Sequence, residues 1–416
     1  MKTNSVFSVN DFSRLYAARF ISTVGAKFFS LAISWWVLDS NFKDANSLLG
    51  IIMAATAIGT FGFAPFMGAI ADSYSKKTTM IAALAGNAIV VGITILLFVL
   101  GVFNAVPLLF ALFAILIYAF EPLAETSMQG SLNYIVPPDL LPGAVSIVSG
   151  ITSFSQAIGA AFAGAAIVVL GVAGAFSFDA LCYIVSIFFV LRLTTPLPVE
   201  SNNDATVPNT KNSKSSFWKN FVEGFKYVKD DKALFALLIF FAVINLFVSP
   251  IVLALPIIAK TVYNGSALLM SGYEIALGGG VAVLSTLAGF IKKKYNRYGA
   301  GFIAIIFCGV SLAGLAVSHN LIVSFIFVFL FGCGMGFVNV SMMTLFQSYV
   351  PPFIQGRFFS ILNTIAGAVI PLSYAIVGFV SSKINIMDLM FINGCILAAS
   401  SFVMLCIKKI EGEYVL

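Results

Sequence analysis

The feature that most constrains this chain is a series of apolar runs, each about 20 residues long or longer. A helix of about 20 residues crosses the ~30 Å hydrocarbon core of a bilayer, where only helices and closed barrels satisfy their backbone hydrogen bonds. Only 10% of the 416 residues are charged, whereas soluble domains carry about 25%. We therefore predict an all-α membrane protein with twelve spanning helices, at residues 14–39, 47–71, 78–101, 106–132, 143–171, 173–195, 232–261, 267–291, 299–318, 320–349, 354–382 and 384–407.

A polar stretch rich in Pro, Asn and Ser separates the first six runs from the last six. Residues 196–216 cannot bury apolar area, which predicts a linker. The residues that follow place Phe217, Phe221 and Phe225 on one face, a pattern typical of an interfacial amphipathic helix. We predict an N-terminal bundle at 1–195, a cytoplasmic linker with this helix at 196–231 and a C-terminal bundle at 232–416.

The basic residues predict the orientation of the spans. Most of the 23 Lys and Arg residues lie in loops on one side, whereas the loops on the other side hold Lys43, Lys260 and Lys383. By the positive-inside rule, both termini lie in the cytoplasm. The net charge of +6 therefore reflects membrane topology, and we expect no nucleic-acid partner.

The two halves share short loop patterns. The segment at 68–77, GAIADSYSKK, follows the second run and has a counterpart at 289–297 after the eighth. Val-Pro-Pro follows the fourth run at 136–138 and the tenth at 350–352. Parallel six-helix repeats with a site between them at the bilayer midplane are typical of one large class of secondary transporters.

The segment GAIADSYSKK resembles the signature loop of the major facilitator superfamily, G-x-x-x-D-R-x-G-R-[RK], although Ser73 replaces the first arginine. The residues in register are Gly68, Asp72, Lys76 and Lys77. Further stretches, at 12–39, 175–186 and 224–260, resemble the drug:proton antiporter branch that includes macrolide efflux proteins and the enterobactin exporter. The resemblance implies two six-helix bundles related by a pseudo-two-fold axis along the membrane normal, in a bacterial-type inner membrane. It also implies that the four residues in register help to gate the cytoplasmic side.

Four ionisable residues lie inside predicted spans, where a charge is costly unless it is paired or hydrated. Lys27 and Glu121 lie near the middle of the first and fourth spans, which line the central cavity in the resembled fold. Glu125 is one helical turn beyond Glu121, and Pro122 between them should loosen that turn. Glu274, in the eighth span, faces these charges or lies in an outer vestibule.

We predict that Glu121, with Glu125, alternates between a protonated state and a carboxylate paired with Lys27, which couples proton influx to export. The alternative is a permanent buried pair that only fixes the helix register. Relatives often carry an acid at position 26, where this chain has Ala26 followed by Lys27, and this change favours substrates with an anionic group.

Several neutral residues are candidates for substrate binding. They are Asn245, Gln156, Asn339, Asn363 and Trp35. Trp35 and Trp36 are otherwise interface anchors near the outer end of the first span. We expect Asp179 to be a structural group near the outer end of the sixth span.

We predict a secondary transporter that exports an amphipathic small molecule, drug-like or macrolide-like or a siderophore, by alternating access. The chain has no Walker A loop, so an ion gradient must supply the energy: we expect protons, and sodium remains open. We expect no cofactor or metal, no enzymatic activity and a monomer. The competing hypotheses are an importer or lipid-moving member of the superfamily and, from other classes, a channel or a membrane-embedded enzyme.

Overall fold

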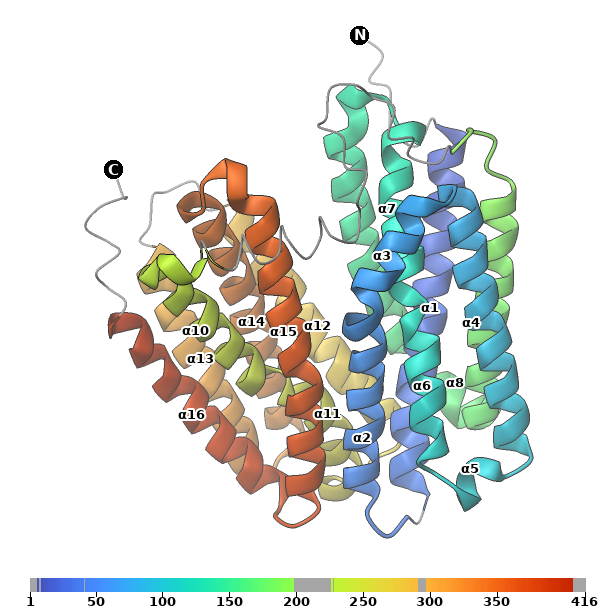
Figure 1. The fold of residues 1–416 in the computed structure, drawn as a ribbon. Helices are drawn as coiled ribbons and strands as arrows, with labels where there is room; N and C mark the ends of the chain where they lie inside the picture. The colour runs from blue at the N-terminus through green and yellow to red at the C-terminus, as the bar shows by residue number, and fades with distance from the viewer. Residues whose placement is uncertain are drawn as a thin grey trace. The chain divides into compact units, whose positions relative to one another are not determined.

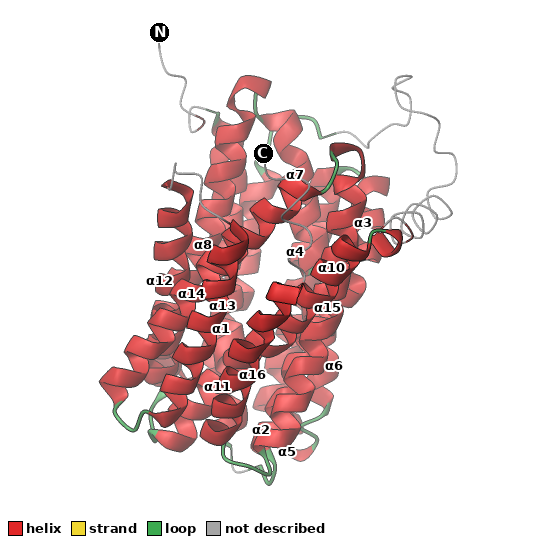
Figure 2. Cartoon of the chain, turned by 90° about the vertical axis from the view of Figure 1, so that its left-hand side faces the viewer, coloured by secondary structure: helices red, strands yellow, loops and turns green. Residues whose placement is uncertain are grey.

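The computed structural model describes residue 6 and residues 9–40, 42–197, 226, 228–290 and 297–406. All the regular elements in these ranges are helices, and they contain no strand (Figure 2). Ten helices in the described ranges are long and apolar enough to cross a membrane, and Ile386–Phe402 is a shorter apolar helix. An all-helical membrane protein is therefore confirmed. The predicted interfacial helix at 217–228 and the loop at 289–297 lie mostly outside the described residues.

The chain divides into two compact units. The first comprises Met1–Asn203 and Ala259–Glu274, and the second comprises Asp204–Ile258 and Ile275–Leu416. The helix α12 (Ala267–Phe290) therefore contributes its first residues to the first unit and the rest to the second. Each unit is described by itself below.

The first unit is built from long helices whose apolar runs pack against one another (Figure 1). In chain order its elements are α1 (Asn10–Asp39), α2 (Ala45–Ala57), the π-helix η2 (Ile58–Gly62), α3 (Phe63–Ser73), α4 (Lys76–Val99), α5 (Val102–Ala105), α6 (Leu109–Ala119), α7 (Glu121–Ile135), the 3₁₀ helix η3 (Pro138–Leu140) and α8 (Leu141–Leu191). The helix α1 packs against α8, and α4 packs against both α7 and α8. The α1–α8 contact forms the centre of this unit.

Two local breaks shape these helices. Pro122 lacks a backbone N–H and cannot continue the hydrogen-bond ladder, and the helix is interrupted at Phe120, between α6 and α7. Gly171 adopts φ 71° and ψ 179°, a conformation that is almost restricted to glycine. The element α8 therefore consists of two helical segments, 141–170 and 172–191, and the break coincides with the predicted boundary between two spans.

The second unit contains α10 (Lys232–Val248), α11 (Pro250–Ile257), most of α12, α13 (Arg297–Val317), α14 (Leu321–Tyr349), α15 (Pro352–Ser381) and α16 (Ile386–Cys406). A π-helix, η4 (Ile258–Val262), follows α11. Pro250 cannot donate to the carbonyl four residues earlier, at Leu246. The hydroxyl of Ser373 on α15 donates to that carbonyl at 2.9 Å. The side chain of Asn393 on α16 donates to the next carbonyl, Phe247, at 2.7 Å.

Trp36 lies in an aromatic cluster inside the first unit. Its indole contacts the rings of Phe42, Phe98, Phe103 and Phe110, with centroids 5.1 to 6.2 Å away. The side chain is buried. The prediction that Trp36 is an interface anchor is therefore wrong, because a ring enclosed by four phenylalanines has no face left for the bilayer surface.

Candidate functional site

A cavity of about 190 Å³ lies within the first unit, lined by α1, α4, α6, α7 and both segments of α8. Its walls are unusually polar for the interior of an apolar bundle. The polar side chains that line it are Arg19, Ser22, Thr23, Lys27, Ser30, Asn87, Tyr118, Glu121, Gln156, Asp179 and Tyr183. Charged groups inside spanning helices are expensive and commonly mark ion or substrate pathways.

Lys27 forms an ion pair with Glu274. Its Nζ donates to Oε2 of Glu274 at 3.1 Å, and both side chains are partly buried. Glu274 lies on the part of α12 that belongs to the first unit. The structure therefore brings together two of the residues predicted from the sequence, which come from helices 247 positions apart.

The pairing predicted between Lys27 and Glu121 is not what the structure shows. The carboxylate of Glu125 lies 3.5 Å from Arg19, whose role the sequence analysis missed. Glu121 instead accepts a 3.5 Å hydrogen bond from Thr60, which lies in the π turn η2. Lys27 is held by Glu274, so Glu121 and Glu125 have separate partners although they lie one turn apart on α7.

Close approach of α1 to α8 depends on two glycines. A Cβ at Gly25 would lie 2.7 Å from Oδ1 of Asp179, and a Cβ at Gly159 would lie 2.7 Å from Cβ of Lys27. Any larger residue at either position would push α1 away from a segment of α8. The two glycines therefore determine how close α1 lies to α8, and with it the position of the Lys27 side chain in the cavity.

Asp179, expected to be a structural group near the outer end of a span, lines the cavity. It is 0% exposed, and neither carboxylate oxygen has a hydrogen-bond partner. Asn87 on α4 is 3% exposed, and its Oδ1 also lacks a partner. The signal in the sequence was an acid flanked on both sides by apolar residues, a pattern that by itself favours a functional group.

The neutral residues predicted to bind substrate are scattered. Gln156 lines the cavity of the first unit, whereas Asn245 and Asn339 line a cavity of about 60 Å³ in the second unit. Asn363 is exposed. The ring of Trp35 lies 4.4 Å from Nζ of Lys260, a cation–π contact that holds the indole.

The predicted gating loop is organised around a buried lysine. Lys76 is 2% exposed, and its Nζ donates to Oδ1 of Asp72 at 2.9 Å and to the carbonyl of Ala71 at 3.0 Å. Its stem packs near Gly130, where a Cβ would lie 3.1 Å from Cε of Lys76. A Cβ at Gly68 would meet no atom within 4 Å, so packing does not require a glycine there.

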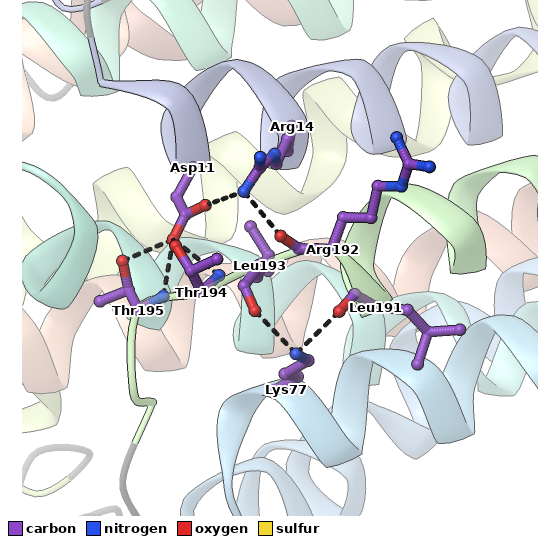
Figure 3. Close-up of polar contacts among 8 residues, drawn as sticks. All are labelled: Asp11, Arg14, Lys77, Leu191, Arg192, Leu193, Thr194 and Thr195. Carbon is purple, nitrogen blue, oxygen red and sulfur yellow. Dashed lines mark hydrogen bonds and ion pairs between the residues drawn. The ribbon is translucent and has the colours of Figure 1, made fainter.

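A second polar cluster joins the start of α1, the start of α4 and the end of α8 (Figure 3). Lys77 donates to the carbonyls of Leu191 and Leu193 at 3.0 and 2.8 Å, and Arg14 donates to that of Arg192 at 2.7 Å. These carbonyls belong to the last residue of α8 and to the two residues that follow it, so the two cations cap the end of this helix. We call this group, with Asp11, Thr194 and Thr195, the helix-end cluster.

Asp11 is the acceptor at the centre of the helix-end cluster. Its Oδ2 accepts from the backbone N–H groups of Thr194 and Thr195 at 2.9 and 2.6 Å and from both hydroxyls. Its Oδ1 accepts from Arg14 at 2.8 Å. Nothing in the sequence around Asp11 indicates this role, because an acid in the first turn of a helix ordinarily serves the helix dipole alone.

Long apolar helices around a cavity with paired and unpaired charges define a multi-pass membrane protein of the transporter type. Within the described residues no group of three or more His, Cys, Asp or Glu side chains could hold a metal ion. The chain belongs to the Major Facilitator Superfamily, a family of membrane transporters whose model matches residues 15–374.

Individual relatives agree with this assignment. The chain is 20% identical over 407 residues to macrolide efflux protein A of Streptococcus pyogenes, with 96% of each chain covered. It is 22% identical over 357 residues to the staphyloferrin A transporter of Staphylococcus aureus, with 83% of this chain and 84% of the relative covered. The solved structure of nucleoside transporter NupG covers 96% of this chain and 99% of its own, with a TM-score of 0.78 at 13% identity, a likeness of fold alone. The family inferred from the sequence is confirmed.

Proposed function

We propose that this protein is a secondary active transporter that exports an amphipathic small molecule by alternating access, driven by an inward flux of protons. Two relatives, named as a macrolide efflux protein and a staphyloferrin A transporter, support a drug-like or siderophore substrate. A panel that contains both classes of compound identifies the substrate. Sodium remains the second possible coupling ion.

The observation that carries the proposal is the charge pattern of the cavity. Arg19 and Lys27 each have a carboxylate partner, at 3.5 and 3.1 Å. Among the described residues, no Lys or Arg lies within 4 Å of Glu121, which has only the long hydrogen bond from Thr60. A partly buried carboxylate without a close ion pair is costly, so Glu121 is suited to take up and release a coupling ion.

In the proposed cycle, Lys27 exchanges partners. A proton that enters from outside neutralises Glu121, and its later release restores a carboxylate that competes with Glu274 for Lys27. An anionic group of the substrate competes for the same ammonium. Because Glu274 lies on α12, which continues into the second unit, loss of the Lys27–Glu274 pair frees the start of a helix that belongs to both units.

The proposed topology has twelve spans. The two segments of α8 supply two crossings, and α16 supplies the last. The bundles at 1–195 and 232–416 are joined by the cytoplasmic linker at 196–231, both termini lie in the cytoplasm, and the protein is a monomer in the plasma membrane. The loop at 68–77 then lies on the cytoplasmic side, where Asp72 and Lys76 brace the gate.

Transport by the purified protein in proteoliposomes, under an imposed pH gradient, tests the proposal. A panel of labelled macrolides and siderophores is offered to vesicles whose exposed face is cytoplasmic. We expect accumulation of at least one compound only when the lumen is acidic, and dissipation of the gradient in step with that compound. Protein-free vesicles and vesicles treated with a protonophore are the controls.

The same assay separates the competing functions. Accumulation that requires the opposite gradient orientation would identify an importer. Proton flux without any substrate would identify a channel, and movement of labelled lipid alone would identify a lipid transporter. Chemical conversion of a panel compound would identify an enzyme. Each of these outcomes would contradict the proposed function.

A further inference from the structure

Two deeply buried side chains in the cavity of the first unit present oxygen atoms without partners. Asp179, on the segment 172–191, is 0% exposed, and both of its carboxylate oxygens lack a hydrogen bond. Asn87, on α4, is 3% exposed, and its Oδ1 lacks one. Both residues line the same cavity of about 190 Å³. Buried polar atoms without partners are rare, so two residues in one cavity call for a physical explanation.

All three unpartnered atoms are acceptors. A carboxylate and an amide oxygen can only receive a hydrogen bond or coordinate a cation. Within the described residues, no N–H or O–H group reaches them. Because an ionised carboxylate that is buried without a partner costs several kcal/mol, a positive charge from outside the chain is needed at Asp179.

The two cations that line the cavity are already paired. The titratable groups that line the cavity with Asp179 are Arg19 and Lys27 from α1, Tyr118 from α6, Glu121 from α7 and Tyr183 from α8. Arg19 is paired with Glu125, and Lys27 is paired with Glu274. After these two pairs are balanced, the carboxylates of Glu121 and Asp179 remain without a counter-charge.

The backbone of α1 lies directly against the carboxylate of Asp179. A Cβ at Gly25 would lie 2.7 Å from its Oδ1 and 2.7 Å from Cβ of Cys182. Gly25 thus leaves just enough space for the carboxylate in its present position. A methyl group there would displace either α1 or Asp179.

We propose that Asp179 and Asn87 form the binding site of a small inorganic cation, a proton or a sodium ion, separate from Glu121. The inference rests on the proposed ion-coupled transport and assigns a second ion site to it. Hard oxygen ligands suit such ions.

Ion binding can be tested on the full-length protein in detergent, without substrate or transport. The sodium arm measures the melting temperature in NaCl against choline chloride at equal ionic strength. The proton arm measures, by infrared difference spectroscopy between two pH values, the carbonyl stretch of a protonated carboxyl group. The variants are Asp179→Asn and Asn87→Leu, and the exposed Asp388→Asn is the matched control.

If the ion is sodium, NaCl raises the melting temperature of the wild type, and the shift is lost in Asp179→Asn and reduced in Asn87→Leu. If the ion is a proton, NaCl has no effect, and a protonated-carboxyl band is lost in Asp179→Asn and shifts in frequency in Asn87→Leu. The control keeps the wild-type signal in both cases. If Asp179→Asn fails to fold, Asn87→Leu alone shows whether the ion signals depend on the cavity.

The proposal is overturned if the wild type shows neither signal, or if the signals persist unchanged in both cavity variants. These results are independent of the transport assay. A wild type that binds the ion through Asp179 but moves no panel compound would contradict the proposed function alone. If the wild type exports a compound but its melting shift and carboxyl band are unchanged in Asp179→Asn and Asn87→Leu, this inference alone is contradicted.

Discussion

The helix-end cluster and the cavity of the first unit are both polar, but they differ in how completely their charges are matched. In the helix-end cluster, Asp11 accepts five hydrogen bonds, and Lys77 donates to two terminal carbonyls. In the cavity, Asp179 has no partner and Glu121 has one long hydrogen bond. A saturated cluster has one stable arrangement and holds helices together, whereas an unsaturated one gains stability only when an ion or ligand arrives. We therefore expect the first cluster to serve stability, and we propose that the second serves transport.

The largest effect is expected when Lys27 loses its charge. Lys27→Met leaves Glu274 partly buried without a cation, which should lower the free energy of unfolding by about 3 kcal/mol. It should also abolish transport of substrates with an anionic group. Thermal denaturation in detergent and proteoliposome transport measure the two effects.

A double variant separates these effects. Adding Glu274→Gln removes the orphaned carboxylate, so K27M/E274Q should recover most of the stability but none of the transport. The pair would be shown to be purely structural if the double variant transported at the wild-type rate.

The second-largest effect is expected at Asp11, in the helix-end cluster. Asp11→Asn replaces a charged acceptor by an amide whose NH₂ group opposes the donors around it, and it should cost about 2 kcal/mol of stability. Transport per folded molecule should be unchanged. The exposed Asp388→Asn is the control, with an effect within about 0.5 kcal/mol. A loss of transport in folded Asp11→Asn protein would erase the distinction between the two clusters.

The smallest effect is expected at Thr60. Thr60→Val keeps the shape of the side chain but removes its 3.5 Å hydrogen bond to Glu121, so stability should change by less than about 1 kcal/mol. Gradient-driven transport should persist, because Glu121 keeps its carboxyl group. Loss of gradient-driven transport in this variant would show that coupling requires the Thr60 hydroxyl as well as the Glu121 carboxyl group.

The helices of this protein could be predicted from the sequence, because long apolar runs have few alternatives in lipid. Pro122 predicted a loosened turn between Glu121 and Glu125, but the structure keeps that turn helical and interrupts the helix just before it, at Phe120. A boundary between two predicted runs did fall at Gly171. Lys27 and Glu121 stood out for the same reason, since charges are rare in apolar runs, whereas Arg19 was missed and Asp179 was expected to be structural. The presence of a charge in a span is thus a local property of the chain.

The partner of each charge could not be predicted. Which acid faces Lys27 depends on the rotation of several helices, on the π turn around Thr60 and on the close approach of α1 at Gly25 and Gly159. None of these follows from spacing within one helix. The burial of Asp179 is also a tertiary property, because α1 covers it through Gly25. The identities of the charged residues were therefore predicted better than their pairs.

The most direct test of the central claim compares two modes of transport in Glu121→Gln. With a compound that the wild type exports, gradient-driven accumulation and substrate counterflow without a gradient are measured in the same proteoliposomes. The account predicts that Glu121→Gln loses gradient-driven accumulation and keeps counterflow, because the variant binds and moves substrate but cannot exchange the coupling ion. Full gradient-driven accumulation by Glu121→Gln would contradict it.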